Sequence, residues 1–167
     1  PVLGLVLLAG CKSITPDGGL NEVAELTSAA VRQDLVIRDE DSAPAIEARL
    51  KTLLARPLSA DAAVQVALLR NAGLQAAFNE LCIAQTALVS ASLPPSPTIS
   101  VARLSSVVEL EVERRIVANV IALATLPARA EIAADRFKQA KLKTAEKVFS
   151  LAGDVRRAYY QAVASQQ

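Results

Sequence analysis

Apolar positions repeat every seven residues in two long stretches of the chain and every two residues between them. In the first stretch two rows keep the interval of seven: Leu74, Leu81, Leu88 and, three positions later, Ala77, Ala84, Ala91. Such a/d spacing is typical of a helix packed along its length on another helix. Ser59 is a suitable N-cap, and the paired prolines at 94–95 cannot continue a helix. We therefore expect a helix over residues 59–92, bent or briefly interrupted by the Asn-Ala-Gly at 71–73.

The second helical stretch follows Pro127. Two rows again keep the interval of seven: Ala145, Ala152, Tyr159 and Val148, Val155, Ala162. The pattern predicts a helix over residues 127–167, and about 40 residues of helix extend roughly 60 Å. The helical register continues to the last residue without a Gly or Pro stop signal, so we expect the natural chain to continue.

Between the two predicted helices, apolar residues recur at every second position. Three apolar residues, Val108, Leu110 and Val112, alternate with three acidic ones, Glu109, Glu111 and Glu113. Alternation of this kind places the two groups on opposite faces of a strand. Ile99 and Val101 also alternate with polar residues, so we expect a hairpin within 97–124, with a turn near 105–107 and a second strand that could continue to about 124. An isolated hairpin is marginal in water, and this one needs further strands.

The chain begins with an apolar run that ends at a cysteine, "LVLLAGCKS". This run is too short to span a bilayer, which takes about 20 helical residues. It has the apolar core and small residues of a secretory signal without the basic start, so we expect residues 1–11 to be a truncated signal peptide. Residues 12–56 read as a polar tether followed by a short helix from about 44 to 55, and 22–37 stays open between helix and irregular chain.

The composition favours long packed helices over a thick core and excludes several functions. Apolar residues make up 52% of the chain but aromatics only 3%, and there is no Trp, Met or His. The net charge is +1 without a basic block, which disfavours nucleic-acid binding. The absence of His removes the commonest general base and metal ligand. We expect no catalytic residue, no cofactor and no metal site, and no enzyme activity.

Three segments together resemble the first part of a TolC-type outer-membrane efflux factor. They are "AVQVALLRNAGLQAA", "ELCIAQTALVSASLPPSP" and "DVRRAYYQAVA", and the likeness extends from about Pro57 to the last residue. The resemblance implies a mainly α fold with a β-hairpin. Long coiled-coil-like helices flank the hairpin, which contributes to a trimeric outer-membrane β-barrel, while the helices form a periplasmic α-barrel. Family chains have two such halves, so residues 57–167 would be an incomplete domain whose gating residues lie beyond Gln167.

The resemblance also gives the first cysteine a role. The lipoprotein subgroup of the family carries a lipobox, which "LAGC" matches at Leu8, Ala9, Gly10 and Cys11. It implies that Cys11 becomes the acylated first residue of the mature protein, with palmitate-like chains that each contribute about 0.8 kcal/mol per buried methylene. Lys12 is not an inner-membrane retention Asp, so the implied place is the outer membrane of a Gram-negative bacterium, lipid-anchored and extending into the periplasm. The alternative is an ordinary buried or free cysteine.

Within the implied barrel, the alternating residues would divide between lipid and lumen. Val108, Leu110 and Val112 would face lipid, and Glu109, Glu111 and Glu113 the water-filled lumen. The alternative is a soluble sheet with one exposed acidic face. Cys82 stands where the family usually has a small residue, and we expect it to pack as a small hydrophobe.

The function that the resemblance implies is that of a passive exit duct. Family members act as homotrimers with a periplasmic adaptor and an inner-membrane pump, in contact with outer-membrane lipid, and let solutes, drugs or metal ions leave the cell. A second hypothesis is a non-conducting coiled-coil envelope lipoprotein with a structural role. A hairpin interrupting the heptads disfavours a simple spacer. A third, a periplasmic enzyme using a pair such as Glu109 and Glu111, lacks apolar surroundings that would raise one carboxyl pKa.

Overall fold

The computed structural model describes residues 14–31, 34–36, 41–105 and 110–166, and these are mainly helical. Along the chain the elements are α1 (Leu20–Ser28), α2 (Ala43–Leu54), α3 (Ala60–Arg70), α4 (Ala72–Ser92), β1 (Thr98–Ser105), β2 (Leu110–Val117), α5 (Val120–Ala124) and α6 (Leu126–Ala164). The order therefore contains the expected sequence of helix, hairpin and long helix.

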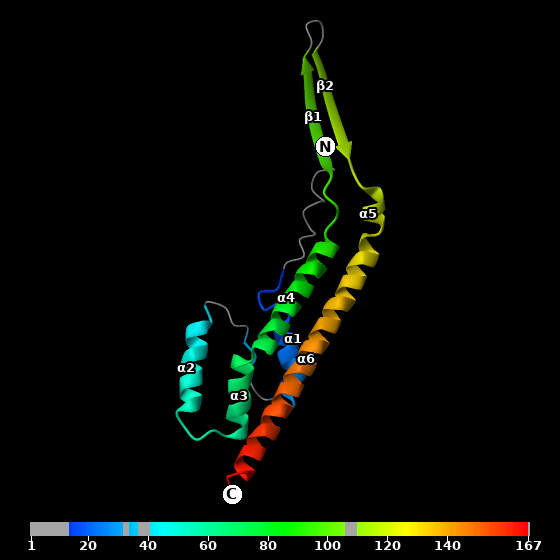
Figure 1. The fold of residues 1–167 in the computed structure, drawn as a ribbon. Helices are drawn as coiled ribbons and strands as arrows, with labels where there is room; N and C mark the ends of the chain where they lie inside the picture. Colours follow the sequence, from blue (N-terminus) through cyan, green and yellow to red (C-terminus); the bar gives the residue numbers. More distant parts are fainter. Residues whose placement is uncertain (1–13, 32–33, 37–40, 106–109, 167) are drawn as a thin grey trace.

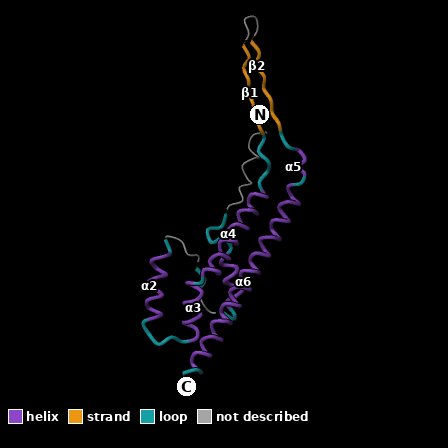
Figure 2. Tube along the Cα trace, viewed as in Figure 1, coloured by secondary structure: helices purple, strands orange, loops and turns teal. Residues whose placement is uncertain are grey.

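Two long helical columns run side by side (Figure 1). α3 and α4 follow one another in the first column, and α6 forms the second and contacts both. At the end of α4 the chain leaves the helices as the hairpin of β1 and β2, then returns through the short α5 into α6 (Figure 2). α2 packs on α3, and α1 packs on α6. The hairpin thus projects from one end of a helical bundle.

The core lies where α1, α3, α4 and α6 meet. The largest group of buried apolar side chains contains Leu20, Val31, Val64, Leu68, Leu74, Phe78, Val148 and Ala152. A second group joins Val23 of α1 to Leu81 of α4 and Ala145 of α6. A third holds α2 on α3 through Ile46, Leu50 and Leu69. The heptad rows are confirmed at six positions, because Leu74, Ala77, Leu81, Ala145, Val148 and Ala152 are all buried. The later members of each row are half-buried or exposed.

The helix expected over 59–92 is two helices that meet at Asn71. Ser59 is the N-cap that the sequence suggested, and its hydroxyl accepts the N–H of Ala62 at 3.2 Å. Asn71 leaves the helical conformation, with ψ at 114°, and its side-chain oxygen accepts the N–H of Leu74 at 2.8 Å. A helix N-cap side chain satisfies an otherwise orphaned backbone donor, which explains why a new helix begins here.

The second strand is shorter than the pattern suggested. β2 ends at Val117, and the apolar run that could have continued it to about 124 forms α5 instead. Asn119 caps α5, because its side chain accepts the N–H of Ala122 at 2.9 Å. An Asn just before an apolar run is a helix-start signal, and it overrides the strand propensity of Val120 and Ile121.

The remaining helices are close to the expectations. α2 covers Ala43–Leu54, one residue before the range expected at each end, with Pro44 in its first turn. α6 covers Leu126–Ala164 where 127–167 was expected, and Gln167 lies outside the described residues. The range 22–37, left open between helix and irregular chain, contains most of α1 and then irregular chain at 34–36.

Two glutamines, one in α3 and one in α4, hold the irregular residues 34–36 after α1. The amide of Gln65, almost fully buried, accepts the N–H of Asp34 at 3.1 Å and donates to its carbonyl at 3.2 Å. Gln75 donates to the carbonyl of Val36 at 3.1 Å. Because Gln65 lies in α3 and Gln75 in α4, residues 34–36 bridge the break at Asn71.

Candidate functional site

The side chains that the structure describes in the hairpin are exposed. β1 and β2 pair antiparallel, with Thr98 opposite Val117 and Ser100 opposite Arg115, and the described sheet has these two strands. Ile99 and Val101 are 69% and 67% exposed, and Val117, which alternation places on the other face, is also exposed. Apolar side chains therefore meet solvent on both faces of the described hairpin.

The residues predicted to divide between lipid and lumen fall on β2 or just before it. Val108 and Glu109 lie outside the described residues. The backbone register pairs Leu110, Glu111, Val112 and Glu113 with Ser105, Leu104, Arg103 and Ala102. The strand predicted for them is confirmed at these four positions, and their assignment to lipid or lumen stays a prediction. Leu8, Ala9, Gly10 and Cys11 also lie outside the described residues.

An apolar surface surrounds the junction of hairpin and helices. The C-cap of α4, Leu93, is exposed, as are Val120, Ile121 and Leu123 of α5. Arg129 of α6 donates to the carbonyl of Ala122 at 3.2 Å and so ties α5 to the long helix. The junction therefore combines exposed apolar side chains with an arginine that holds the short helix in place.

The segment before α1 docks on the two long helices, a contact that the sequence analysis missed by treating it as a tether. Gly18 and Gly19 have φ of 61° and 86°, the left-handed region that favours glycine. A Cβ on Gly18 would lie 2.6 Å from Sγ of Cys82, and one on Gly19 would lie 2.7 Å from Cζ of Phe137. Paired glycines in "PDGG" could have signalled a turn, but not its docking partner.

Polar contacts also hold this segment. Gln85 of α4, buried, donates to the hydroxyl of Thr15. Asp17 accepts the N–H of Asn21 at 3.1 Å in the first turn of α1. That backbone hydrogen bond is the main reason why the pKa of the Asp17 carboxyl is lowered from 3.8. At the other end of α1, Arg156 of α6 donates to the carbonyl of Ala30 at 3.5 Å and to Asp61 of α3 at 3.3 Å.

Cys82 is a half-buried free thiol among the described residues. Its sulfur packs against the backbone of Gly18. The position requires a small side chain, because a larger one would displace the glycine turn. This agrees with the prediction of a small packed side chain.

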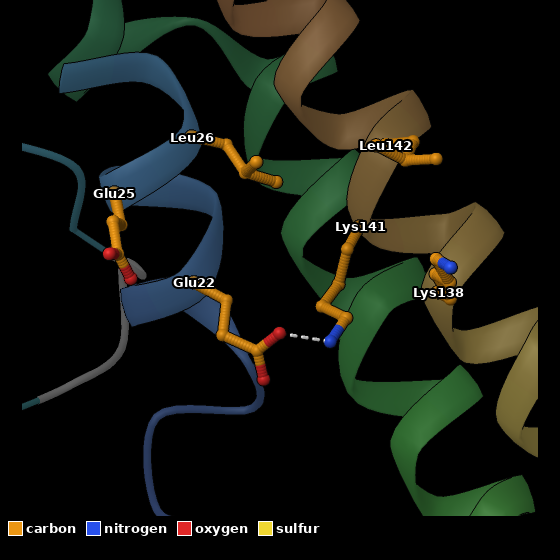
Figure 3. Close-up of a pocket in the computed structure, with 6 residues that line it drawn as sticks. All are labelled: Glu22, Glu25, Leu26, Lys138, Lys141 and Leu142. Atoms are coloured by element: carbon orange, nitrogen blue, oxygen red, sulfur yellow. Dashed lines mark hydrogen bonds and ion pairs between the residues drawn. The ribbon is translucent and has the colours of Figure 1, made fainter. Parts of the chain in front are cut away.

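A pocket of about 520 Å³ lies between α1 and α6 (Figure 3). Two leucines, two glutamates and two lysines line it: Leu26, Leu142, Glu22, Glu25, Lys138 and Lys141. Lys141 pairs with Glu22, and its ammonium lies 4.8 Å from the ring centroid of Phe137. The lining carries no hydroxyl, thiol or imidazole that could act as a nucleophile. The pocket lies where α1 packs on α6, and its charged groups include the Lys141–Glu22 ion pair that joins the two helices.

No group of three or more His, Cys, Asp or Glu side chains within the described ranges could hold a metal ion. None of the helices in those ranges is long and apolar enough to span a membrane. Comparisons of the chain with protein-family models, with curated proteins and with solved structures found no match.

Proposed function

We propose that this chain is the first part of a TolC-type outer-membrane efflux factor of the lipoprotein subgroup, and that it forms part of a passive exit duct. In this proposal three copies contribute their hairpins to one barrel in the outer membrane and their helix pairs to a tunnel in the periplasm. A periplasmic adaptor and an inner-membrane pump supply the cargo and the energy.

The observation that carries the proposal is the continuity of α4, the hairpin and α6. The columns keep a buried heptad seam, and where they end the chain becomes a sheet with exposed apolar residues on both faces. Within lipid every backbone polar group must be paired, and a closed barrel is the way in which strands achieve this. A two-stranded hairpin leaves the outer edge of each strand open to pairing with a further strand. The exposed edges and apolar faces of β1 and β2 therefore support the proposal that other strands complete the sheet.

The hairpin also separates this proposal from its alternative, a coiled-coil envelope lipoprotein that only braces the envelope. A brace works best as an uninterrupted heptad pattern. Here the pattern is broken by prolines at 94 and 95 and by eight-residue strands on each side of the turn. A protein that only braces the envelope would have no use for these two strands.

The test is conductance by the complete gene product. Purified in detergent and added to planar lipid bilayers, it should assemble as a trimer and produce discrete conductance steps. A folded trimer that never conducts would contradict the duct and favour the structural lipoprotein. A monomer that inserts nothing into lipid would contradict both.

Lipidation is tested separately. We expect the mature N-terminal peptide to begin at Cys11 and to carry acyl chains detectable by mass spectrometry. Cys11→Ser should abolish the acyl mass and leave the precursor unprocessed. An unmodified Cys11 in membrane-extracted protein would contradict the anchor while leaving the duct to the conductance measurement.

A further inference from the structure

The pair of helices α4 and α6 has two broad faces, and α1 covers one of them. Val23 of α1 packs on Leu81 of α4 and Ala145 of α6, so α1 lies over the seam between the two helices. The glycine turn before α1 extends this cover to Phe137. The pocket on this side is lined by residues of α1 and by Lys138 and Lys141 of α6 (Figure 3).

The other broad face is open. A groove of about 400 Å³ runs between α4 and α6 there, with a floor of three alanines, Ala84, Ala87 and Ala91. Arg129, Ile132 and Arg136 line it from α6. Arg136 precedes Lys138 by two residues, which is about 200° around a helix, so the two side chains leave α6 on opposite sides. The groove and α1 therefore lie on opposite faces of the helix pair.

Cations form a row along this open face. Arg129, Arg136 and Lys143 recur at intervals of seven, and Lys147 follows four residues later, all of them exposed. On a helix this row extends about 27 Å. Among the described ion pairs, one includes a residue of this row: Glu80 of α4 pairs with Lys147 at 3.7 Å.

Among the other acids in the same part of α6, Glu146 follows Lys143 by three residues and lies beside the row, so the four cations face two acids, Glu80 and Glu146. Two further acids point away from the row. Glu131 follows Arg129 by two residues and Asp135 precedes Arg136 by one, rotations of about 200° and 100°. The open face therefore carries an excess of positive charge over a floor of small side chains.

We propose that this open face lines the water path of the duct and that its cations make the path favour anionic solutes. The inference rests on the proposed function. The other face is already covered by α1 and the glycine turn before it, so the open face is the one left for water. The alanine floor leaves room, and a row of like charges from each of three copies raises the local concentration of counter-ions. The cargo class is then anionic or carries an anionic group.

The experiment measures ion selectivity of the complete gene product in planar bilayers under a salt gradient of potassium chloride. We expect chloride to be more permeant than potassium. The triple variant Arg129→Gln, Arg136→Gln, Lys143→Gln should lower the chloride-to-potassium permeability ratio by about twofold or more. A matched control removes three exposed cations elsewhere, Lys51→Gln, Arg56→Gln and Lys138→Gln, and should leave the ratio unchanged.

The outcomes separate the two proposals. Absence of any conductance from a folded trimer overturns the duct itself. Conductance that prefers potassium, or a ratio that responds to the control triple and not to the row, overturns the inference and leaves the duct standing. If the triple variant fails to assemble, Arg136→Gln alone serves, with Lys138→Gln as its partner on the opposite face.

Discussion

The helical bundle and the hairpin contain similar apolar residues but differ in what covers them. Phe78, Leu68 and Val148 are almost completely buried by other parts of this chain. Ile99 and Val101, in the hairpin, keep about two-thirds of their surface exposed. Burial of a large apolar side chain contributes roughly 1.5–3 kcal/mol, a gain that the bundle makes within this chain and that Ile99 and Val101 do not make. The fold is therefore packed by its own chain at one end and keeps apolar side chains exposed at the other.

The largest loss of stability is expected when a side chain is removed from the core of the bundle. Phe78→Ala should cost about 3–5 kcal/mol of unfolding free energy, because the site is fully enclosed and the cavity persists. Helical circular dichroism during urea unfolding in mild detergent measures the loss. Ile83→Ala on the exposed side of the same helix is the control and should change stability by no more than about 0.5 kcal/mol. Equal losses in both variants would mean that α4 is not packed as described.

A smaller effect is expected where the first segment docks on the bundle. Gly18→Ala should cost about 2 kcal/mol, from a left-handed φ and from a contact with the sulfur of Cys82. Adding Cys82→Ala removes the contact but not the backbone strain, so the double variant should be less destabilised than the sum of the single ones. Gly153→Ala, in open space on α6, should instead stabilise by roughly 0.5–1 kcal/mol. Strict additivity at Gly18 and Cys82 would show that the segment does not dock there.

Acid should loosen the same segment. The pKa of Asp17 is lowered in the folded state, so its ionised form stabilises α1 at pH values above the ordinary 3.8. That contribution is lost as the pH falls through the lowered pKa, because the protonated side chain accepts the N–H of Asn21 less well. Asp17→Asn should remove this pH dependence and weaken the first turn of α1 at neutral pH, because the amide oxygen accepts the N–H of Asn21 less strongly than a carboxylate does. Hydrogen exchange of the α1 amides as a function of pH measures it, and identical profiles for both proteins would exclude Asp17 as a group that stabilises α1.

The smallest effect on the bundle is expected from the hairpin. Ile99→Ser together with Val101→Ser should change the unfolding free energy of the helices by less than about 0.5 kcal/mol, because both side chains are already exposed. In the proposed duct the same variant should lose conductance. A large drop in helical stability would show that the hairpin packs on its own chain, which would contradict the duct.

Local patterns account for the elements that the sequence predicted well. The rows of Leu74, Leu81, Ala145 and Ala152 are buried where the interval of seven placed them. Ser59 caps α3 as its position suggested. Helix periodicity and capping depend on residues within a turn or two of each other, so they can be read from one segment alone.

One expectation failed and another was left open where one local signal had to be weighed against another. The apolar run after Val117 fits both a strand and a short helix, and the cap at Asn119 decides for α5. The Asn-Ala-Gly at 71–73 was expected to bend or interrupt the helix; the cap at Asn71 makes it an interruption, and Gln65 and Gln75 hold residues 34–36 across it. In the second case the contacts across the break come from about 30 to 40 residues away.

By itself the sequence determined the periods of its helices and strands, where most of them begin and end, and the classes of chemistry that its composition excludes. Tertiary structure decided that residues 14–31 dock on the long helices, which broad face they cover, and therefore where the cationic row of α6 stays open. The physical reason is distance along the chain. A heptad row depends on residues in neighbouring helical turns, so it can be recognised in a single segment. The contacts of Gly18 with Cys82 and of Gly19 with Phe137 form only when segments far apart in the sequence come together.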